Sequence, residues 1–220
     1  MKIVLINTTA VSGSTGKIAY GFYSKLKEHR NDVRIYYGRN DKVDESDIIC
    51  FNTKLDIYIH AFMARLTGLQ GYFSSFATNR LIKELKEFKP DIVQLYNLHG
   101  YYLNMKKLFK YLGKANIPVI YSMLDEYPYL GRCCYSFDCE NFGCECYGCS
   151  IDKREYPATW LFRHSHKFNV DKKKSYDFVE KMCFVGPQWV IERAKMSNLL
   201  KSRSVFCVDE YRYGKTVLPT

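Results

Sequence analysis

Two apolar runs of the sequence, 92–96 and 119–124, each end in polar residues that could bind or activate a hydroxyl group. Asn97 and His99 follow the first run, and Asp125 and Glu126 follow the second. Near-continuous apolar runs of this length are typical of strands covered on both faces in a parallel sheet. Because ligands bind at the carboxyl ends of such strands, a substrate is expected beside these side chains. His99 also has a simpler interpretation as a structural histidine.

Tyrosines crowd the same two strand ends. Tyr101, Tyr102 and Tyr127 could stack on the faces of sugar rings while their hydroxyl groups form hydrogen bonds. Tyrosines at strand ends are also ordinary packing residues, so both interpretations stay open.

A loop of small residues follows a strand that is predicted over 2–7. Gly13, Ser14, Thr15 and Gly16 precede a helix whose apolar positions are spaced four apart. Such a loop lets backbone amides at a helix start approach a phosphate or a sugar hydroxyl. It matches neither a dinucleotide-binding fingerprint nor a phosphate-binding lysine loop, so a tight connection without a ligand is the alternative.

Cysteines form the sharpest chemical pattern, because six of the nine lie between positions 133 and 149. Disulfides are not expected in a chain without a secretion signal, so this density predicts a metal ion or an iron–sulfur cluster. Cys146 and Cys149 have the two-residue gap of a ligand pair, and Cys133 and Cys139 are the simplest second pair. Four thiolates would hold structural zinc or iron tetrahedrally. The alternative is a set of free thiols in a buried loop.

The elements that must position these groups alternate along the chain. Strands are predicted over 2–7, 32–38, 92–96 and 119–124, and helices over 80–88 and 102–112. The alternation predicts an α/β fold with a doubly wound parallel sheet and right-handed crossovers. The 220 residues, 47% of them hydrophobic, are expected to form one domain.

The formal net charge of +10 favours an anionic partner, such as a phosphorylated small molecule, an acidic membrane surface or nucleic acid. No helix-turn-helix or RNA-binding motif is present, so nucleic acid is not predicted. The sequence does not open with a basic and apolar leader, and it contains no run of about 18 apolar residues. These patterns predict a cytoplasmic chain without a membrane span.

Two further segments have competing interpretations. Residues 55–77 could form a helix that lies at an anionic membrane surface, or a core helix with one solvated edge. The basic residues of 163–167 and 172–174 are most simply a solvated face. The more specific interpretation is that these basic residues contact a lipid diphosphate or an anionic membrane.

Several of these motifs together resemble one family, the GT-B glycosyltransferases of group 1 (family 4), in the branch linked to colanic acid and capsule biosynthesis. The similar segments are 12–18 for its N-terminal glycine loop, 90–104 for its central motif, 131–133, 146–149 and 155–157 for its cysteine loop, and 185–189 for the start of a late helix. The resemblance covers about residues 1–200, which corresponds to the N-terminal, acceptor-side domain.

The resemblance implies one Rossmann-like domain over 1–205, with a Cys-rich insertion over 131–150 and an atypical tail over 206–220. The family's second domain, which binds the nucleotide sugar, would begin where this sequence ends, so a separate donor-domain chain is an expected partner. A second departure is Leu124, at a position where the family carries a histidine. Leucine cannot donate a hydrogen bond or shuttle a proton.

In function, the resemblance implies sugar transfer from a nucleotide-sugar donor to a saccharide acceptor, carried on a lipid diphosphate, during assembly of a bacterial surface polysaccharide. Asp125 and Glu126 would be the catalytic bases. The implied substrate-binding residues are Gly13, Ser14, Thr15, Gly16, Asn97, His99, Tyr101, Tyr102 and Tyr127. The chain would act at the inner face of the plasma membrane. The alternatives are a non-catalytic, metal-stabilised binding or scaffold module and a truncated, inactive transferase half.

Overall fold

The computed structural model describes residues 1–39, 42–139 and 141–208. Among these residues, seven strands form one sheet in the order β3-β2-β1-β4-β5-β6-β7, and every neighbouring pair is parallel. The strands are β1 (Lys2–Asn7), β2 (Asp32–Tyr37), β3 (Ile48–Cys50), β4 (Ile92–Leu95), β5 (Val119–Ser122), β6 (Met182–Gly186) and β7 (Ser204–Cys207). The predicted α/β class with a parallel sheet is confirmed, and the fold is consistent with a Rossmann-like domain.

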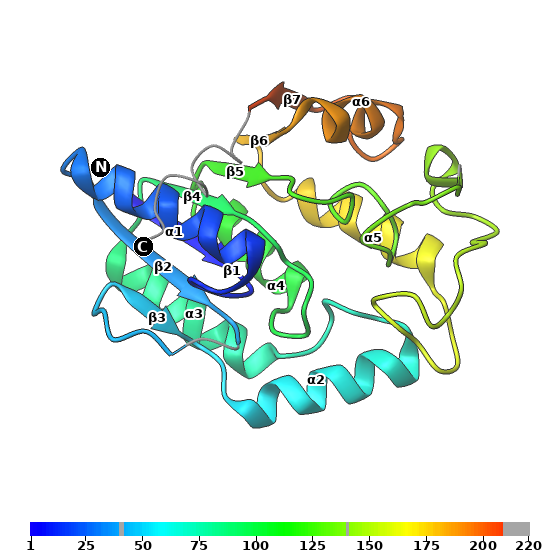
Figure 1. The fold of residues 1–220 in the computed structure, drawn as a ribbon, viewed down its shortest axis with the longest axis horizontal. Coiled ribbons are helices and arrows are strands. Elements are labelled where there is room, and N and C mark those ends of the chain that lie inside the picture. The colour runs from blue at the N-terminus through cyan, green and yellow to red at the C-terminus, as the bar shows by residue number, and fades with distance from the viewer. Residues whose placement is uncertain (40–41, 140, 209–220) are drawn as a thin grey trace.

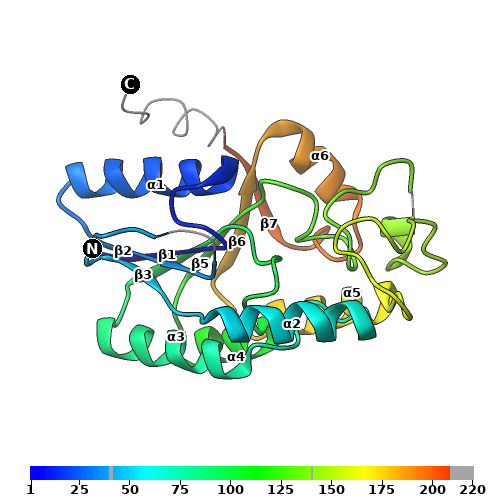
Figure 2. The same cartoon turned by 60° about the horizontal axis from the view of Figure 1, so that its bottom comes forward.

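Helices cover both faces of the sheet (Figure 1). They are α1 (Gly13–Glu28), α2 (Lys54–Thr67), α3 (Ser75–Phe88), α4 (Met105–Lys114), α5 (Ser165–Tyr176) and α6 (Gln188–Met196), with one 3₁₀ turn, η1 (Asn141–Cys144). Figure 2 shows α1 and α6 on one side of the sheet and α3, α4 and α5 on the other, with α2 along the outer edge of the second layer. None of the described helices is long and apolar enough to cross a membrane.

Two clusters of buried side chains join these layers. In the smaller cluster, Ile18 of α1 packs with Leu5 and other branched residues of β1 and β2. The larger cluster fills the opposite side of the sheet, where Leu81 of α3 and Leu108 of α4 are completely buried, and it also includes Val190 of α6. Strands covered in this way on both faces need apolar side chains at nearly every position, which explains the apolar runs of the sequence.

The predicted boundaries agree more closely in the strands than in the helices. β1 spans the predicted 2–7, whereas α4 begins three residues later than predicted. The reason is that Asn104 caps this helix: its side chain accepts a hydrogen bond from the backbone N–H of Lys107. Strands β3, β6 and β7 and helix α5 are absent from the sequence-based prediction.

The last strand of the sheet, β7, extends past the predicted domain boundary at residue 205. Strand β7 continues to Cys207, and Val208 is the last residue that the structure describes in this part of the chain. The rest of the predicted tail, 209–220, lies outside the described residues.

Residues 123–164, between β5 and α5, are called the irregular segment below. Apart from η1, its described residues form no helix or strand, and it contains the predicted Cys-rich insertion 131–150. Loops of more than about 15 residues without secondary structure are uncommon in compact domains. This segment must therefore be held in place by its side chains.

Candidate functional site

The strand order reverses between β1 and β4, and in open α/β sheets ligands bind at the carboxyl ends of strands at such a reversal. The loops after these strands are joined there, because the Thr8 hydroxyl lies 2.9 Å from the carbonyl oxygen of Asn97 and 2.7 Å from that of His99. Gly100 has a φ of +114°, and a Cβ at this position would lie 2.8 Å from Cγ2 of Thr8. Glycine therefore allows the close approach that fixes the loop carrying His99.

His99 and Asp125 come from two different strand ends and form a hydrogen bond with each other. Nε2 of His99 lies 2.7 Å from Oδ2 of Asp125, and Nδ1 of His99 lies 3.0 Å from the hydroxyl of Tyr156. The other carboxylate oxygen, Oδ1, accepts a hydrogen bond from the backbone N–H of Tyr127. Only 14% of the His99 side chain and 12% of the Asp125 side chain are exposed. The two residues thus share one sheet edge, as predicted, and their chemical roles stay predictions.

A cavity of about 220 Å³ opens beside this pair and is called the rim cavity. The residues lining it are Ser14, Thr15, Ile18, Asn97, His99, Leu124, Asp125, Cys134, Tyr135 and Tyr156. Oδ1 of Asn97 is buried and has no hydrogen-bond partner among the described residues. An unpaired buried acceptor costs about 1–3 kcal/mol, which a hydroxyl donor on a ligand would offset.

Three ligand atoms at the rim cavity are close enough together to hold a metal ion. His99, Asp125 and Cys134 each offer one atom, and the three atoms lie within 4.8 Å of one another. An imidazole, a carboxylate and a thiolate together suit zinc or a similar transition metal. Burial raises the pKa of the Cys134 thiol well above its ordinary value, so metal binding here would have to displace the thiol proton.

Glu126 faces away from the rim cavity although it follows Asp125 directly. It is 3% exposed, and its carboxylate accepts hydrogen bonds from the Ser136 backbone N–H (2.6 Å), the Tyr129 hydroxyl (2.8 Å) and Nε of Arg193 (2.6 Å). With its acceptor sites occupied in this way, Glu126 ties the irregular segment to α6. A structural role fits this geometry better than the predicted catalytic role.

The three predicted tyrosines are buried and do not line the rim cavity. Tyr102 is completely buried, and its hydroxyl donates to a backbone carbonyl. Tyr127 is also completely buried, with its ring centroid 5.2 Å from that of His99 and 3.5 Å from Nζ of Lys172. Tyr101 is 5% exposed. The packing interpretation describes these residues, although Tyr127 also supports the position of the His99 ring.

The predicted glycine loop contributes two of its four residues to the rim cavity. Ser14 and Thr15 line it from the first turn of α1, which begins at Gly13 with a φ of +67°. Gly16 is buried, and a Cβ there would lie 2.7 Å from Oγ1 of Thr9. The lack of a side chain at position 16 thus lets the helix start lie close to the loop after β1.

Sequence reasoning missed Tyr156 and Cys134 as residues of this site. Both belong to the irregular segment, far along the chain from Asn97 and His99. Cys134 was not selected because other cysteines in the same segment have spacings closer to those of metal ligands. The resemblance had included Tyr156 in a similar segment, but nothing in the sequence indicates that it contacts His99.

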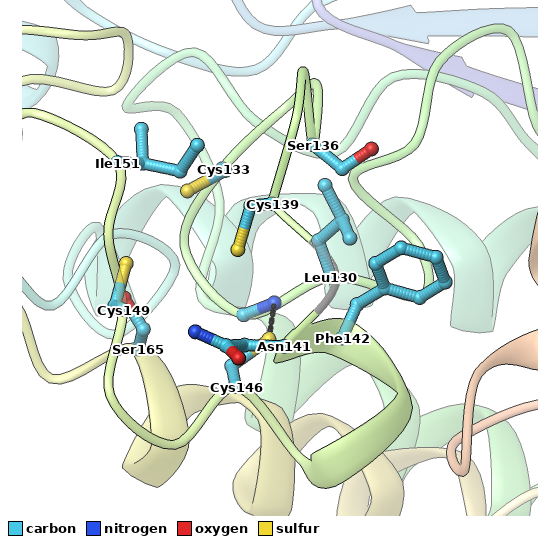
Figure 3. Close-up of a pocket in the computed structure, with 11 residues that line it drawn as sticks. Leu130, Cys133, Ser136, Cys139, Asn141, Phe142, Cys146, Cys149, Ile151 and Ser165 are labelled. Atoms are coloured by element: carbon cyan, nitrogen blue, oxygen red, sulfur yellow. Dashed lines mark hydrogen bonds between the residues drawn. The ribbon is translucent and has the colours of Figure 1, made fainter.

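The four cysteines predicted as metal ligands line a second, smaller cavity of about 20 Å³. Figure 3 shows the sulfur atoms of Cys133, Cys139, Cys146 and Cys149 around a common space. The backbone N–H of Gly131 donates to the sulfur of Cys146 at 3.2 Å. The set chosen from spacing is therefore brought together, and it is called the cysteine cluster below.

The thiols of the cysteine cluster differ in acidity. A hydrogen bond from Cys133 lowers the pKa of Cys149 to about 5, whereas burial raises the pKa of Cys146 to about 11. Among the described residues, the rim group at His99 is the one set of three or more ligand side chains that lie close enough together to hold a metal ion. Metal binding at the cysteine cluster would therefore draw its sulfur atoms closer together.

The prediction that residues 172–174 form a solvated face is wrong for Lys172, which is only 1% exposed. Its ammonium group donates to the carbonyl oxygens of Leu130 (3.0 Å), Gly131 (2.8 Å) and Tyr127. Burial lowers the pKa of Lys172 to about 7. The sequence shows three similar lysines, and only the packing of α5 against the irregular segment distinguishes the buried one.

A second buried cation, Arg132, stabilises the other half of the irregular segment. Its side chain is 1% exposed and donates to the carbonyl oxygens of Asp152, Glu155 and Pro157. Hydrogen bonds from a charged donor contribute about 1.5–3 kcal/mol each, which suits a segment without its own secondary structure.

The sequence matches no model of a known protein family, and no curated protein matches it either. The chemistry of this chain is therefore carried by the residues and geometry of the rim cavity and the cysteine cluster.

Proposed function

We propose that this chain is the acceptor-side half of a GT-B glycosyltransferase and that a saccharide acceptor binds in the rim cavity. The observation that carries the proposal is the His99–Asp125 pair next to the unpaired Oδ1 of Asn97, at the reversal of strand order. Asp125 would orient the reacting hydroxyl and accept its proton. Asn97 would accept a hydrogen bond from a second hydroxyl, and His99 would hold the carboxylate in place.

The resemblance supports a particular reaction, in which a sugar passes from a nucleotide-sugar donor to a saccharide on a lipid diphosphate during bacterial surface polysaccharide assembly. A separate donor-domain chain would bind the nucleotide and complete the active site. The acceptor lipid would place the reaction at the cytoplasmic face of the membrane.

Saccharide binding is tested by saturation-transfer NMR with a panel of monosaccharides and their diphosphates. Signals are expected for the wild type and should weaken in Asp125→Asn. Asp32→Asn is the matched control, because Asp32 is an exposed carboxylate at the opposite, amino-terminal end of β2. Absence of saccharide signals, or equal signals from Asp125→Asn, would count against the proposed acceptor site.

Transfer is tested by mixing the chain with a donor-domain chain from a neighbouring reading frame, labelled nucleotide sugars and lipid-diphosphate saccharides. Label should enter the lipid fraction only when both chains are present, and much less with Asp125→Asn.

A second candidate function is a binding module that holds a saccharide intermediate without transfer. It is favoured by Leu124, which lines the rim cavity at the position where the resembled family carries a histidine. Saccharide signals in NMR without transfer in any two-chain mixture would support this function instead.

We also propose that the cysteine cluster holds one structural ion, either zinc or iron. The support is the convergence of four thiols on one cavity, the low pKa of Cys149 and the irregular backbone around them. Four thiolates leave no open position for a substrate, so the ion would stabilise the fold.

Elemental analysis of protein purified under reducing conditions tests this metal site. About one ion per chain is expected, as four thiolates make one closed site, and Cys146→Ser should lose it, whereas Cys50→Ser, an exposed thiol, should keep it. Loss of the ion in Cys134→Ser rather than Cys146→Ser would move the site to the rim cavity. Metal-free wild-type protein would refute both locations.

A further inference from the structure

Helix α2 exposes large apolar side chains and buries small ones. Ala61 and Ala64 face the protein, where they pack with Tyr101. The solvent-facing side chains are Leu55 (68% exposed), Tyr58 (71%), Ile59 (54%) and Phe62 (54%). Their spacing of three and four residues forms one stripe along the helix. An amphipathic helix of a globular protein normally turns such a stripe toward the core, whereas among the described residues this stripe is left largely open to solvent.

Three residues of the irregular segment extend the stripe. Trp160, Leu161 and Phe162 are each more than half exposed. The ring centroids of Trp160 and Phe62 lie 5.8 Å apart, and the Trp160 backbone N–H donates to the Arg65 carbonyl oxygen at 2.6 Å. These contacts fix both segments as one surface, called the apolar face below.

A basic hollow adjoins the apolar face at the start of α2. Arg39, Lys42 and Lys54 line this cavity of about 360 Å³, and Tyr58 belongs both to it and to the apolar stripe. Among the described residues of its lining there are three cations and no carboxylate. The hollow is therefore suited to an anion at the edge of an apolar contact.

We propose that the apolar face docks on an anionic lipid bilayer, with the basic hollow on headgroup phosphates. Tyrosine and tryptophan are typical of side chains at the boundary between headgroups and acyl chains, and nearby lysines bind anionic lipid. Lysine is depleted at protein–protein interfaces, so two lysines at this edge favour lipid over a protein partner. The net charge of +10 adds a long-range attraction. The proposal needs no sugar transfer.

Tryptophan fluorescence tests the contact directly, because the chain has two tryptophans and one of them lies on the apolar face. Trp189→Phe leaves Trp160 as the reporter. Its emission should shift to the blue on adding phosphatidylglycerol vesicles, and brominated lipid should quench it. Trp160→Phe leaves Trp189 of α6, on the other side of the sheet, and its emission should not change (Figure 2).

Vesicle sedimentation separates the apolar and charged contributions. The double variant Tyr58→Ser with Phe62→Ser should bind at least about tenfold more weakly, because two exposed aromatic side chains no longer insert. Lys54→Ala should weaken binding about fivefold, since one cation near the membrane contributes about 1 kcal/mol. Lys195→Ala, an exposed cation on α6, is the matched control and should bind as the wild type does. High salt should reduce binding, while phosphatidylcholine vesicles should bind little.

The proposal is overturned if Trp160 emission does not respond to anionic vesicles or if the double variant sediments as the wild type does. An unresponsive Trp160 together with dimers in the wild type that Phe62→Ser abolishes would identify the face as a protein interface. These measurements contain no saccharide, so their failure leaves the proposed transfer untouched.

Discussion

The rim cavity shares five lining residues with the irregular segment, but the residues at its strand ends are stabilised differently from the rest of that segment. His99 and Asp125 follow directly from β4 and β5, whose buried side chains fix the backbone before them. The irregular segment has little regular structure, and buried charged groups such as Lys172 and Glu126 hold it through hydrogen bonds.

This difference indicates where each region is vulnerable. Apolar packing is spread over many contacts, so a polar substitution at the rim should change binding more than stability. A buried charge serves several partners at once, and its removal leaves all of them unsatisfied. The irregular segment should therefore respond strongly to single substitutions and to changes in thiol ionisation.

The largest effect is expected from Lys172→Met. The substitution leaves three buried carbonyl oxygens without their donor, so the free energy of unfolding should fall by about 3 kcal/mol or more. Urea unfolding measures the loss. Lys173→Met is the control, because Lys173 is exposed in the same run, and it should change stability by less than about 0.5 kcal/mol. Equal losses would show that the carbonyl contacts of Lys172 add little.

Thiol ionisation should distinguish Cys149 from an ordinary cysteine in metal-free protein. Its folded pKa of about 5 lies below its ordinary value of 9.0, so the thiolate stabilises the fold fully above pH 9.0, and this contribution is lost as pH falls toward 5.

The same low pKa should show in the reactivity of Cys149. Between pH 6 and 8, the rate of Cys149 alkylation by iodoacetamide should be nearly constant. An ordinary thiol would react about tenfold faster per pH unit. Mass spectrometry of the alkylated peptide gives the rates, and a steep pH dependence at Cys149 would contradict the assignment.

The adjacent carboxylates Asp125 and Glu126 should have different effects when each is changed to its amide, one on saccharide binding and the other on stability. Glu126→Gln weakens charged hydrogen bonds in the irregular segment and should cost about 2 kcal/mol of stability. Asp125→Asn should change stability by less than about 1 kcal/mol yet weaken saccharide binding about tenfold. Urea unfolding and NMR titration measure the two quantities. The contrast between the rim cavity and the buried charged groups of the irregular segment fails if both variants show the same pattern.

The smallest effect is expected from Ser14→Ala at the rim cavity. One neutral hydrogen bond to a ligand contributes about 1 kcal/mol, so saccharide binding should weaken about fivefold while stability stays unchanged. Ser204→Ala, exposed at the start of β7, serves as the control for the same titration. If Ser14→Ala weakened saccharide binding more than Asp125→Asn does, the saccharide would have its main contacts at the start of α1.

Much of the scaffold was predictable because buried parallel strands require apolar runs. The run 119–124 and the polar residues after it are visible without a structure, and so is the expectation that His99 and Asp125 share an edge. The cysteine cluster was also predictable, since ligand spacing is a local property. Strand β3 was not, because its three residues are too short to show a pattern.

The sequence by itself determined the alternation of strands and helices, the strand ends that carry polar groups and the four cysteines that converge. Only the tertiary structure decided that Asp125 faces the rim cavity while Glu126 does not, that Lys172 is buried while Lys173 is exposed, and that α2 turns its apolar stripe outward. The physical reason is that local pattern sets backbone conformation, whereas side-chain surroundings depend on segments far away in the chain. In a loop without regular hydrogen bonds, those distant contacts also fix the direction of each side chain.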